Sequence, residues 1–161
     1  MAKSRLTYAM VGGGKGSFIG PVHRMAIRMD DLADLVAGCF SRDAAGNAAT
    51  GAELGVSPER IYQDWRSLIA AESGKIDFLA VCTPNDSHYP IAKAALEAGI
   101  NVMCEKPLSI SSEEALDLER LARRKRLVLG VPFTYSGYPM VKLLPYPFSF
   151  GSLAKIRNNP Q

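Results

Sequence analysis

The stretch "YAMVGGGKGSFIGPVHRM", residues 8–25, connects a short apolar run to a helical pattern through a turn rich in glycine. In a nucleotide-binding βαβ unit, the first strand ends in such a turn, and its glycines let the backbone approach a pyrophosphate at the N-terminus of the next helix. A structural loop after a strand has a similar composition. The stretch therefore predicts a strand, a turn and a helix, and it leaves a phosphate-binding turn and a structural loop as alternatives.

The spacing of these glycines differs from the usual G-x-G-x-x-G pattern. Gly12 and Gly14 occupy the first two positions, but the third position falls on Ser17. If Gly20 takes the third role, the turn contains three additional residues and the helix begins near Pro21. Proline is well tolerated at the first position of a helix. An enlarged turn is therefore the interpretation that keeps a nucleotide-binding pattern.

Short apolar runs and helical patterns alternate along most of the chain. The expected strands are 5–11, 35–40, 75–82, 100–104 and 127–133, with a further short strand at 60–63. The expected helices are 23–32, 44–55, 64–74, 87–99 and 109–125, with Asp64 and either Ser111 or Ser112 as N-caps. Such alternation predicts right-handed βαβ crossovers. We expect an α/β fold, a Rossmann-like doubly wound parallel sheet in three layers.

The composition is that of one globular domain. The chain has 161 residues, 47% hydrophobic and 22% charged, and lacks both a membrane helix and a secretory signal, so we expect a cytoplasmic protein that binds no membrane. A net charge of +3 does not indicate nucleic acid as a partner. Cys39, Cys82 and Cys104 form neither a disulfide framework nor a zinc spacing. We expect buried free thiols and no metal.

The residues after the second expected strand bear on the choice of cofactor. There the sequence reads "CFSRD", residues 39–43, where NAD enzymes carry an acidic side chain for the ribose hydroxyls. Ser41 and Arg42 suit a 2′-phosphate better, because guanidinium pairs with phosphate in a charge-assisted fork. Asp43 lies one or two positions late for the NAD role and is more often the cap of the next helix. NAD and NADP both remain open.

The segment "TPNDSHYPIAKAALEAGINVMCEKPLS", residues 83–109, resembles the most characteristic stretch of the glucose-fructose oxidoreductase and inositol dehydrogenase family (Gfo/Idh/MocA). In that family a T-P-N-x-x-H segment follows the fourth strand and an E-K-P triplet follows the fifth, and both occur here with the family's spacing. The family's first motif ends in G-x-x-H, which residues 20–23 match, and this supports Gly20 as the third glycine. The resemblance extends from Leu6 to Tyr138 and implies an NAD(P)-dependent oxidoreductase.

The resemblance implies a set of site residues. Lys106 is the catalytic candidate, because a lysine beside the nicotinamide can hold a substrate oxygen and stabilise the negative charge that develops on it. Pro107 is expected to fix the bend, through a cis bond, and Tyr135 either lines the pocket or packs in the core. Without the resemblance, His88 would be a structural histidine and Lys106 a surface lysine. The expected dinucleotide contacts are Gly12, Gly14, Gly20, His23, Ser41, Arg42, Thr83, Pro84, Asn85, His88 and Glu105.

The resemblance also implies a second domain that this sequence lacks. Family members are typically more than twice as long, and their second half is an α+β domain that forms the substrate pocket and supplies a D-x-x-x-H acid/base pair. The histidines here are His23 and His88 alone, so the usual proton-transfer residue is missing. We expect residues 1–134 to form the NAD(P)-binding domain and the proline-interrupted residues 135–161 to form a linker into the missing domain. Exposed apolar residues at 146–150 predict either self-association, as in a homo-oligomer, or disorder of this segment.

Two functions remain open on this evidence. The first is the NAD(P)-binding domain of an oxidoreductase that transfers a hydride between a nicotinamide cofactor and a sugar, cyclitol or related polyol, inactive alone without its C-terminal domain. The second is a non-catalytic dinucleotide-binding or regulatory module. The two share a fold and differ in what lies beyond residue 161.

Overall fold

The computed structural model describes residues 5–29 and 31–138, and its centre is a parallel sheet of five strands. The strands are β1 (Leu6–Gly12), β2 (Ala33–Cys39), β3 (Phe78–Cys82), β4 (Asn101–Cys104) and β5 (Leu129–Gly130). Their spatial order is β2-β1-β3-β4-β5, and each neighbouring pair is parallel. The predicted Rossmann-like doubly wound α/β fold is confirmed.

Local capping sets the ends of several helices. Asp43, Asp64 and Ser111 each accept backbone N–H groups of the turn that follows, at the start of α2, α3 and α5 respectively. The sequence predicts Asp64 as a cap and offers Ser111 as one of two choices for α5, and the structure selects Ser111. The helices are α1 (Ile19–Met29), α2 (Ala44–Glu53), α3 (Trp65–Glu72), α4 (His88–Glu97) and α5 (Ser112–Lys125), with short 3₁₀ turns η1 (Pro58–Arg60), η2 (Asn85–Ser87) and η3 (Thr134–Gly137).

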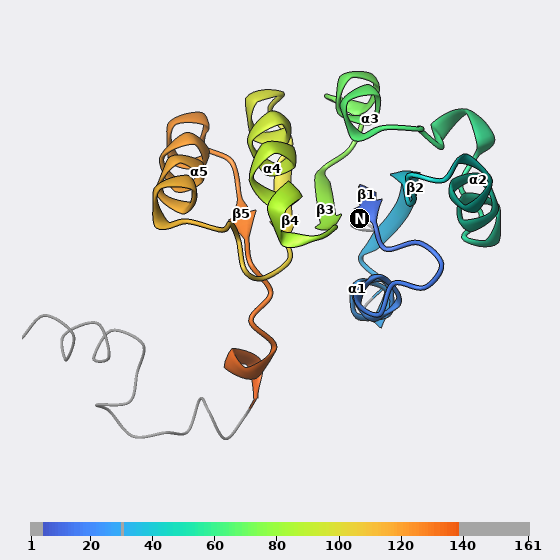
Figure 1. Cartoon of the computed structure of the whole chain (residues 1–161), viewed down its shortest axis with the longest axis horizontal. Helices are drawn as coiled ribbons and strands as arrows, with labels where there is room; N and C mark the ends of the chain where they lie inside the picture. Colours follow the sequence, from blue (N-terminus) through green and yellow to red (C-terminus); the bar gives the residue numbers. More distant parts are fainter. Residues whose placement is uncertain (1–4, 30, 139–161) are drawn as a thin grey trace, which may run out of the picture.

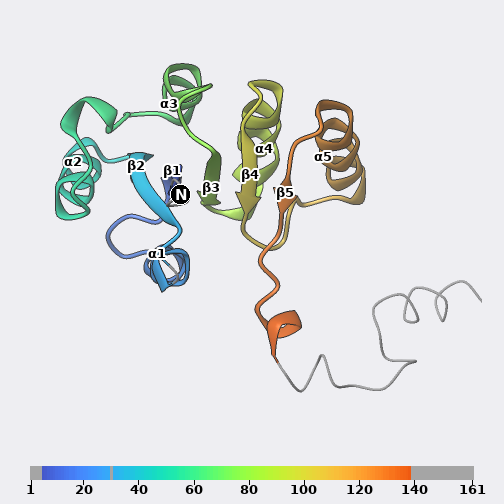
Figure 2. The same ribbon diagram turned by 180° about the vertical axis from the view of Figure 1, so that it is seen from behind.

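Helices lie on both faces of the sheet, which gives the expected three layers (Figures 1 and 2). Leu68 of α3, Ile91 of α4 and Leu118 of α5 join one buried cluster with the strand residues of that face. On the other face, Ile27 of α1 packs against a second cluster that includes Met10. Burial of apolar surface stabilises a fold by about 25 cal/mol per Å², and the burial of these side chains holds the layers together.

The neighbouring strands β1 and β3 send the chain to opposite faces of the sheet. They pair in register from Tyr8 with Phe78 to Gly12 with Cys82. The chain leaves β1 into α1 on one face, and it leaves β3 into α4 on the other (Figure 1). In open α/β sheets, such a switch point creates a crevice at the carboxyl edge, where ligands bind.

Two predicted strands differ from the structure. Residues 60–63 do not form a strand, because Ile61 makes one isolated parallel bridge to Gly38 directly after η1. The T-P-N and E-K-P segments therefore follow the third and fourth strands of this sheet, not the fourth and fifth. The last strand covers two residues instead of seven, since Pro132, two residues after it, has no N–H to donate to a ladder.

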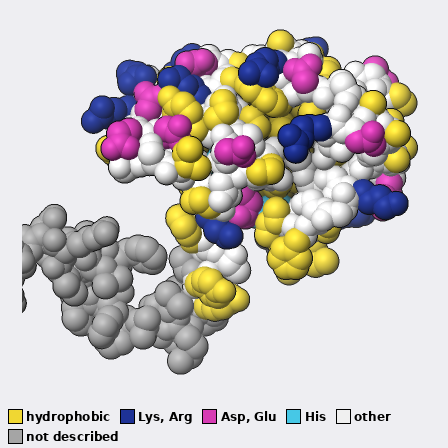
Figure 3. All heavy atoms as spheres, viewed as in Figure 1, with side chains coloured by type: hydrophobic (Ala, Val, Ile, Leu, Met, Phe, Trp, Pro, Cys, Tyr) yellow, Lys and Arg dark blue, Asp and Glu magenta, His cyan; other side chains and the backbone are white. Residues whose placement is uncertain are grey.

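Within the described residues, the two faces of the sheet are covered unequally. Helices α3, α4 and α5 lie along one face, whereas below β3, β4 and β5 the other face carries no α-helix of the described residues (Figures 1 and 2). A hollow of about 360 Å³ lies there, and Phe78, Met103 and Val128 are among its lining residues. Figure 3 shows further hydrophobic side chains over α1 and η3; the exposed ones include Val22, Met25, Tyr135 and Tyr138.

The described part of the chain ends beyond η3. Tyr135 is 75% exposed and contacts the ring of Tyr138 edge to face, so the expectation that Tyr135 packs in the core is wrong. The predicted apolar patch at 146–150, and most of the predicted linker at 135–161, lie outside the described residues. No helix in residues 5–29 or 31–138 has both the length and the apolar character needed to span a membrane.

Candidate functional site

The glycine turn after β1 is built from backbone contacts that exclude a side chain. A Cβ atom at Gly20 would lie 2.4 Å from the Cα and carbonyl oxygen of Gly13. A Cβ atom at Gly12, where φ is +79°, would lie 2.4 Å from the carbonyl oxygen of Cys82. Real Cβ atoms do not approach so closely, and so the start of α1 can pack against the turn only when Gly20 has no side chain. This contact explains why position 20, expected as the third glycine of the turn, needs a glycine.

The residues between Gly14 and Gly20 form a compact corner instead of a free loop. Ser17 N–H donates to the carbonyl oxygen of Gly14, and Gly20 N–H donates to Ser17 Oγ at 3.2 Å. The backbone N–H of Lys15 reaches Thr50 Oγ1 of α2 at 3.4 Å. The helix α1 begins at Ile19, two residues before the expected start, and Pro21 stays within its first turn, where no N–H is needed.

The end of β2 lies directly beside this turn. Gly14 N–H donates to the carbonyl oxygen of Phe40, and the side chain of Asn47 accepts from the N–H groups of Phe40 and Ser41. The Ser41 hydroxyl accepts from the N–H of Asp43. The carboxylate of Asp43 caps α2, which is the role that the sequence offered as the alternative to a ribose contact. Arg42 is exposed, and its guanidinium makes no hydrogen bond or ion pair within the described part of the chain.

The T-P-N segment follows β3 at the same edge of the sheet. Thr83 is half-buried and its Oγ1 accepts from the Ser87 hydroxyl at 2.8 Å. Pro84 and Asn85 are exposed and lead through η2 into α4. The structure therefore places Thr83, Pro84 and Asn85 beyond the carboxyl end of a central strand, as predicted.

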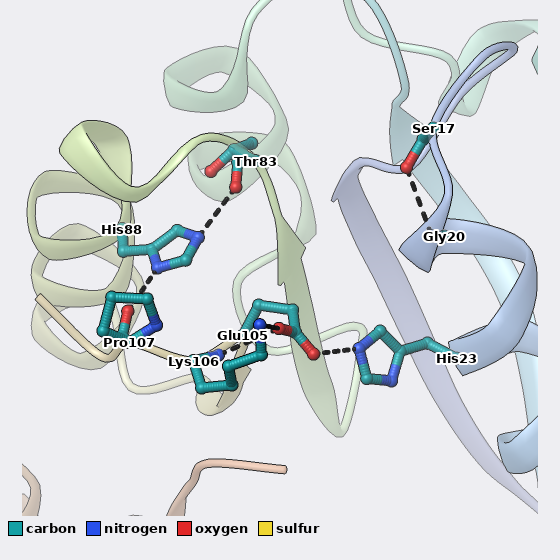
Figure 4. Close-up of polar contacts among 8 residues, drawn as sticks. All are labelled: Ser17, Gly20, His23, Thr83, His88, Glu105, Lys106 and Pro107. Carbon is teal, nitrogen blue, oxygen red and sulfur yellow. Dashed lines mark hydrogen bonds and ion pairs between the residues drawn. The ribbon is translucent and has the colours of Figure 1, made fainter. Parts of the chain in front are cut away.

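His88 is fully buried and connects the T-P-N and E-K-P segments (Figure 4). Its Nε2 lies 2.8 Å from the carbonyl oxygen of Thr83, and its Nδ1 lies 2.7 Å from the carbonyl oxygen of Pro107. Both partners accept hydrogen bonds, so a ring that satisfies both carbonyls must donate from both nitrogens. The peptide bond between Lys106 and Pro107 is cis, as predicted.

Glu105 and Lys106 lie next to each other in sequence but in different environments. The Glu105 side chain is 9% exposed and accepts from His23 Nε2 at 2.7 Å, whereas the Lys106 side chain is 62% exposed. Glu105 Oε2 accepts from the backbone N–H of Lys106 at 3.1 Å and lies 4.0 Å from Lys106 Nζ. Figure 4 shows His23 reaching Glu105 from α1.

The structure separates the predicted site residues into two groups at one edge. The first group is Gly12, Gly14, Gly20, Ser41 and Arg42, at the ends of β1 and β2. The second group is Thr83, Pro84, Asn85, His88, Glu105 and Lys106, at the ends of β3 and β4. His23 belongs to α1 but contacts the second group through Glu105.

Three residues that help to shape this edge were missed by sequence reasoning. Gly13 is the residue that Gly20 contacts, and Arg24 Nη1 donates to its carbonyl oxygen at 2.7 Å. Asn47 fixes the end of β2. The run of glycines could have indicated Gly13. Arg24 and Asn47 lie on helices, and no sequence pattern predicts that their side chains bind the backbone of a neighbouring turn or strand end.

The cysteines are free and buried, as predicted. Burial, followed by the charge of Asp64, raises the pKa of Cys39 to about 11. Burial, followed by the nearby Glu105 carboxylate, raises the pKa of Cys82 to about 12. In the described residues, no three side chains among histidine, cysteine, aspartate and glutamate gather as a metal site.

Comparison with known proteins identifies the family to which the chain belongs. Residues 6–133 match the Gfo/Idh/MocA family, described as an oxidoreductase family with an NAD-binding Rossmann fold. The chain is 39% identical over 156 residues to the uncharacterized oxidoreductase YfiI of Bacillus subtilis (strain 168), covering 94% of this chain and 40% of that protein. It is 30% identical to the levoglucosan dehydrogenase of Pseudarthrobacter phenanthrenivorans, over 94% of this chain and 39% of that one.

A solved structure gives the same result. The inositol dehydrogenase homolog of Azotobacter vinelandii, in complex with NADH and myo-inositol, superposes with a TM-score of 0.83 and 42% identity, over 86% of this chain and 38% of that one. The chain thus spans about 40% of the length of the curated relatives named above.

Proposed function

The chain belongs to the Gfo/Idh/MocA oxidoreductase family, and we propose that it is the dinucleotide-binding domain of an enzyme that transfers a hydride between a nicotinamide cofactor and a sugar, cyclitol or related polyol. One observation carries the proposal: the glycine turn of β1 and the E-K-P segment of β4 lie at the same edge of the sheet, on either side of its switch point. A dinucleotide binds across such a crevice, with one half on each side.

The turn after β1 fits a pyrophosphate. A Cβ atom at Gly16 would meet no atom within 4 Å, so this part of the turn is open to a ligand. The first turn of α1 carries no acidic residue, and the N-terminus of a helix attracts anions through its free N–H groups and its dipole. Gly12, Gly14 and Gly20 would shape this cradle, and His23 lies one turn further along α1.

The end of β2 would hold the adenosine ribose. Ser41 and the exposed Arg42 favour a cofactor with a 2′-phosphate, and Asp43 is already engaged as the cap of α2. We therefore propose that NADP is preferred over NAD. The guanidinium of Arg42, which has no ion-pair partner in residues 5–29 or 31–138, can form two charge-assisted hydrogen bonds with a phosphate group.

The second half of the cofactor would lie over β3 and β4. Thr83, Pro84 and Asn85 line this side, with His88 and Glu105 beneath them. The nicotinamide ring supplies or accepts the hydride when it is bound. Lys106 is the one charged side chain of the E-K-P segment that is exposed, and it would hold the reacting oxygen of the substrate and stabilise negative charge on it.

Proton transfer needs a suitably placed group, and neither histidine of the described residues offers one. Both ring nitrogens of His88 face carbonyl oxygens, and His23 Nε2 is held by the buried Glu105. Neither histidine is placed to exchange a proton with a substrate, a step that typically contributes a factor of about 100 or more. This observation favours a second candidate, a non-catalytic dinucleotide-binding or regulatory module, when the chain acts alone.

Calorimetric titration of NADH and NADPH into the 161-residue chain tests the proposal. We expect binding with a dissociation constant below about 1 mM, and the absence of heat at millimolar concentrations of both would remove it. Addition of NADP⁺ and a range of polyols, followed by nicotinamide absorbance, separates the two candidates. Reduction of the cofactor by the chain alone would exclude the non-catalytic module.

A further inference from the structure

The E-K-P segment is held on both sides of its exposed lysine. On one side, His23 Nε2 contacts the carboxylate of Glu105 at 2.7 Å; on the other, His88 Nδ1 contacts the carbonyl oxygen of Pro107 at 2.7 Å. Lys106 lies between these two fixed points, with its side chain 62% exposed. The arrangement combines a rigid backbone with a charged side chain that reaches the solvent (Figure 4).

Both oxygens of the Glu105 carboxylate have partners within the protein. Oε1 accepts from His23, and Oε2 accepts from the backbone N–H of Lys106 and lies 4.0 Å from its ammonium group. A carboxylate that is 9% exposed is costly to bury unless it is hydrogen-bonded and paired. Glu105 is therefore committed to His23 and Lys106, and a cofactor hydroxyl would have to compete with them.

The contact between His23 and Glu105 also crosses the switch point. His23 lies on α1, which follows the glycine turn of β1, whereas Glu105 follows β4. Strand β3 lies between β1 and β4 in the sheet. The pair therefore connects the helix of the first half of the edge directly to the reactive segment of the second half.

We propose that His23 is a positioning residue for Lys106, acting through Glu105, an inference that rests on the proposed function of Lys106. His23 fixes the Glu105 carboxylate, and that carboxylate holds the backbone of Lys106 and directs its ammonium group towards the crevice. The role assigned to Glu105 is thus to orient its neighbour instead of contacting the cofactor.

The first test needs no cofactor. Amide hydrogen exchange at the N–H of Lys106 is measured by NMR in the free chain, relative to the N–H of Glu105, which donates to the carbonyl oxygen of Val81 in the sheet. The ratio cancels changes in global stability. We expect His23→Leu to raise it about tenfold, whereas His23→Gln, whose amide can donate to Glu105, stays within about threefold of the original chain.

Two further variants keep this test decisive. Glu105→Leu removes both carboxylate oxygens, and with them the acceptor for the Lys106 N–H, so we expect the exchange ratio to rise as in His23→Leu. Arg60→Leu removes the partner of another buried carboxylate, Glu72, whose side chain is 1% exposed at a remote edge, and we expect no change in the ratio. An unchanged ratio in folded His23→Leu, or no recovery in His23→Gln, would overturn the proposal.

The second test compares NADPH with 2′-phospho-ADP-ribose, which lacks the nicotinamide. Positioning of Lys106 affects only the nicotinamide half, so we expect His23→Leu to weaken NADPH binding about tenfold and the ribose analogue less than threefold. Equal weakening of both ligands would show that His23 merely stabilises α1. If the unmodified chain binds neither ligand, the proposed function fails, while the exchange ratio still decides whether His23 holds Lys106.

Discussion

The two halves of the carboxyl edge are held together by different kinds of contact. At the end of β1, glycine backbones pack directly against each other, with Gly20 on Gly13 and Gly12 on the carbonyl oxygen of Cys82. At the ends of β3 and β4, buried polar side chains join the segments, with His88 between two carbonyl oxygens and His23 on Glu105. The closest contacts of the first half depend on the absence of side chains at Gly12 and Gly20, whereas those of the second half depend on buried polar side chains.

This difference predicts which substitutions should destabilise each half. A backbone contact fails when any atom is added, because nothing in it can rotate away. A hydrogen-bonded contact fails when a donor is removed, because a buried acceptor then loses its partner. Substitutions in the two halves should therefore differ both in size of effect and in how a conservative replacement behaves.

The largest effect is expected at Gly20. Gly20→Ala places a Cβ atom 2.4 Å from two atoms of Gly13, and overpacking against fixed backbone should lower the free energy of unfolding by about 3 kcal/mol. Urea denaturation measures the loss. In Gly16→Ala, the control in the same turn, the new atom meets nothing within 4 Å, and only the cost of a positive φ, roughly 1 kcal/mol, should remain. Equal losses in the two variants would contradict the packing role of Gly20.

A somewhat smaller effect is expected at His88. His88→Leu removes the ring nitrogens that face the carbonyl oxygens of Thr83 and Pro107, and the free energy of unfolding should fall by about 2 kcal/mol. Thermal and urea unfolding measure it. Tyr89→Phe, on the same helix, removes a hydroxyl that donates to the partly exposed Asp117, and should cost about 0.5 kcal/mol or less. A loss at His88 no larger than that of the control would mean that the carbonyl contacts are unimportant.

The third effect concerns cofactor choice and leaves the fold unchanged. Arg42→Gln should reduce the preference for NADPH over NADH by about tenfold, because one phosphate partner corresponds to roughly 1.4 kcal/mol. Calorimetric titration of both cofactors measures it. Arg120→Gln removes the same charge from the exposed face of α5 and should leave the ratio unchanged. A chain that binds NADH as well as NADPH before any substitution would refute the role given to Arg42.

The smallest effect is expected at the cap of α2. Asp43→Ala removes the carboxylate that accepts from Gly46 N–H at 2.6 Å, and loss of an N-cap lowers the free energy of unfolding by about 1 kcal/mol. Asp43→Asn retains a capping oxygen and should recover most of the loss in the same urea measurement. If Asp43→Ala instead weakened NADH binding without changing stability, Asp43 would be a ribose ligand.

Sequence reasoning reached the fold because its signals are local. The alternation of apolar runs and helical patterns, the caps at Asp64 and Ser111, and the glycine turn each depend on residues within one element or its ends. The T-P-N and E-K-P segments were recognised by their resemblance to a family, and the structure places both at the predicted edge of the sheet.

The contacts between segments could not be read in the same way. His23 and Glu105 were each expected to contact the cofactor, but they lie 82 positions apart, and no spacing rule connects a helix to a strand across a third strand. Residues 60–63 were expected to form a strand, but Ile61 makes only an isolated bridge to Gly38. The length of this pairing depends on the direction in which the chain leaves η1, and the composition of residues 60–63 does not indicate that direction. Register and side-chain pairing between distant segments arise only from the folded arrangement.

The Gly13–Gly20 contact has one more consequence. Neither residue has a side chain, so this contact has no rotamers to freeze when a ligand arrives, whereas ordering a flexible side chain on binding costs about 0.5–1.5 kcal/mol. The conformational entropy of these two glycines is lost during folding, not during recognition. These two glycines should therefore add little to the ordering cost of binding at this end of the edge.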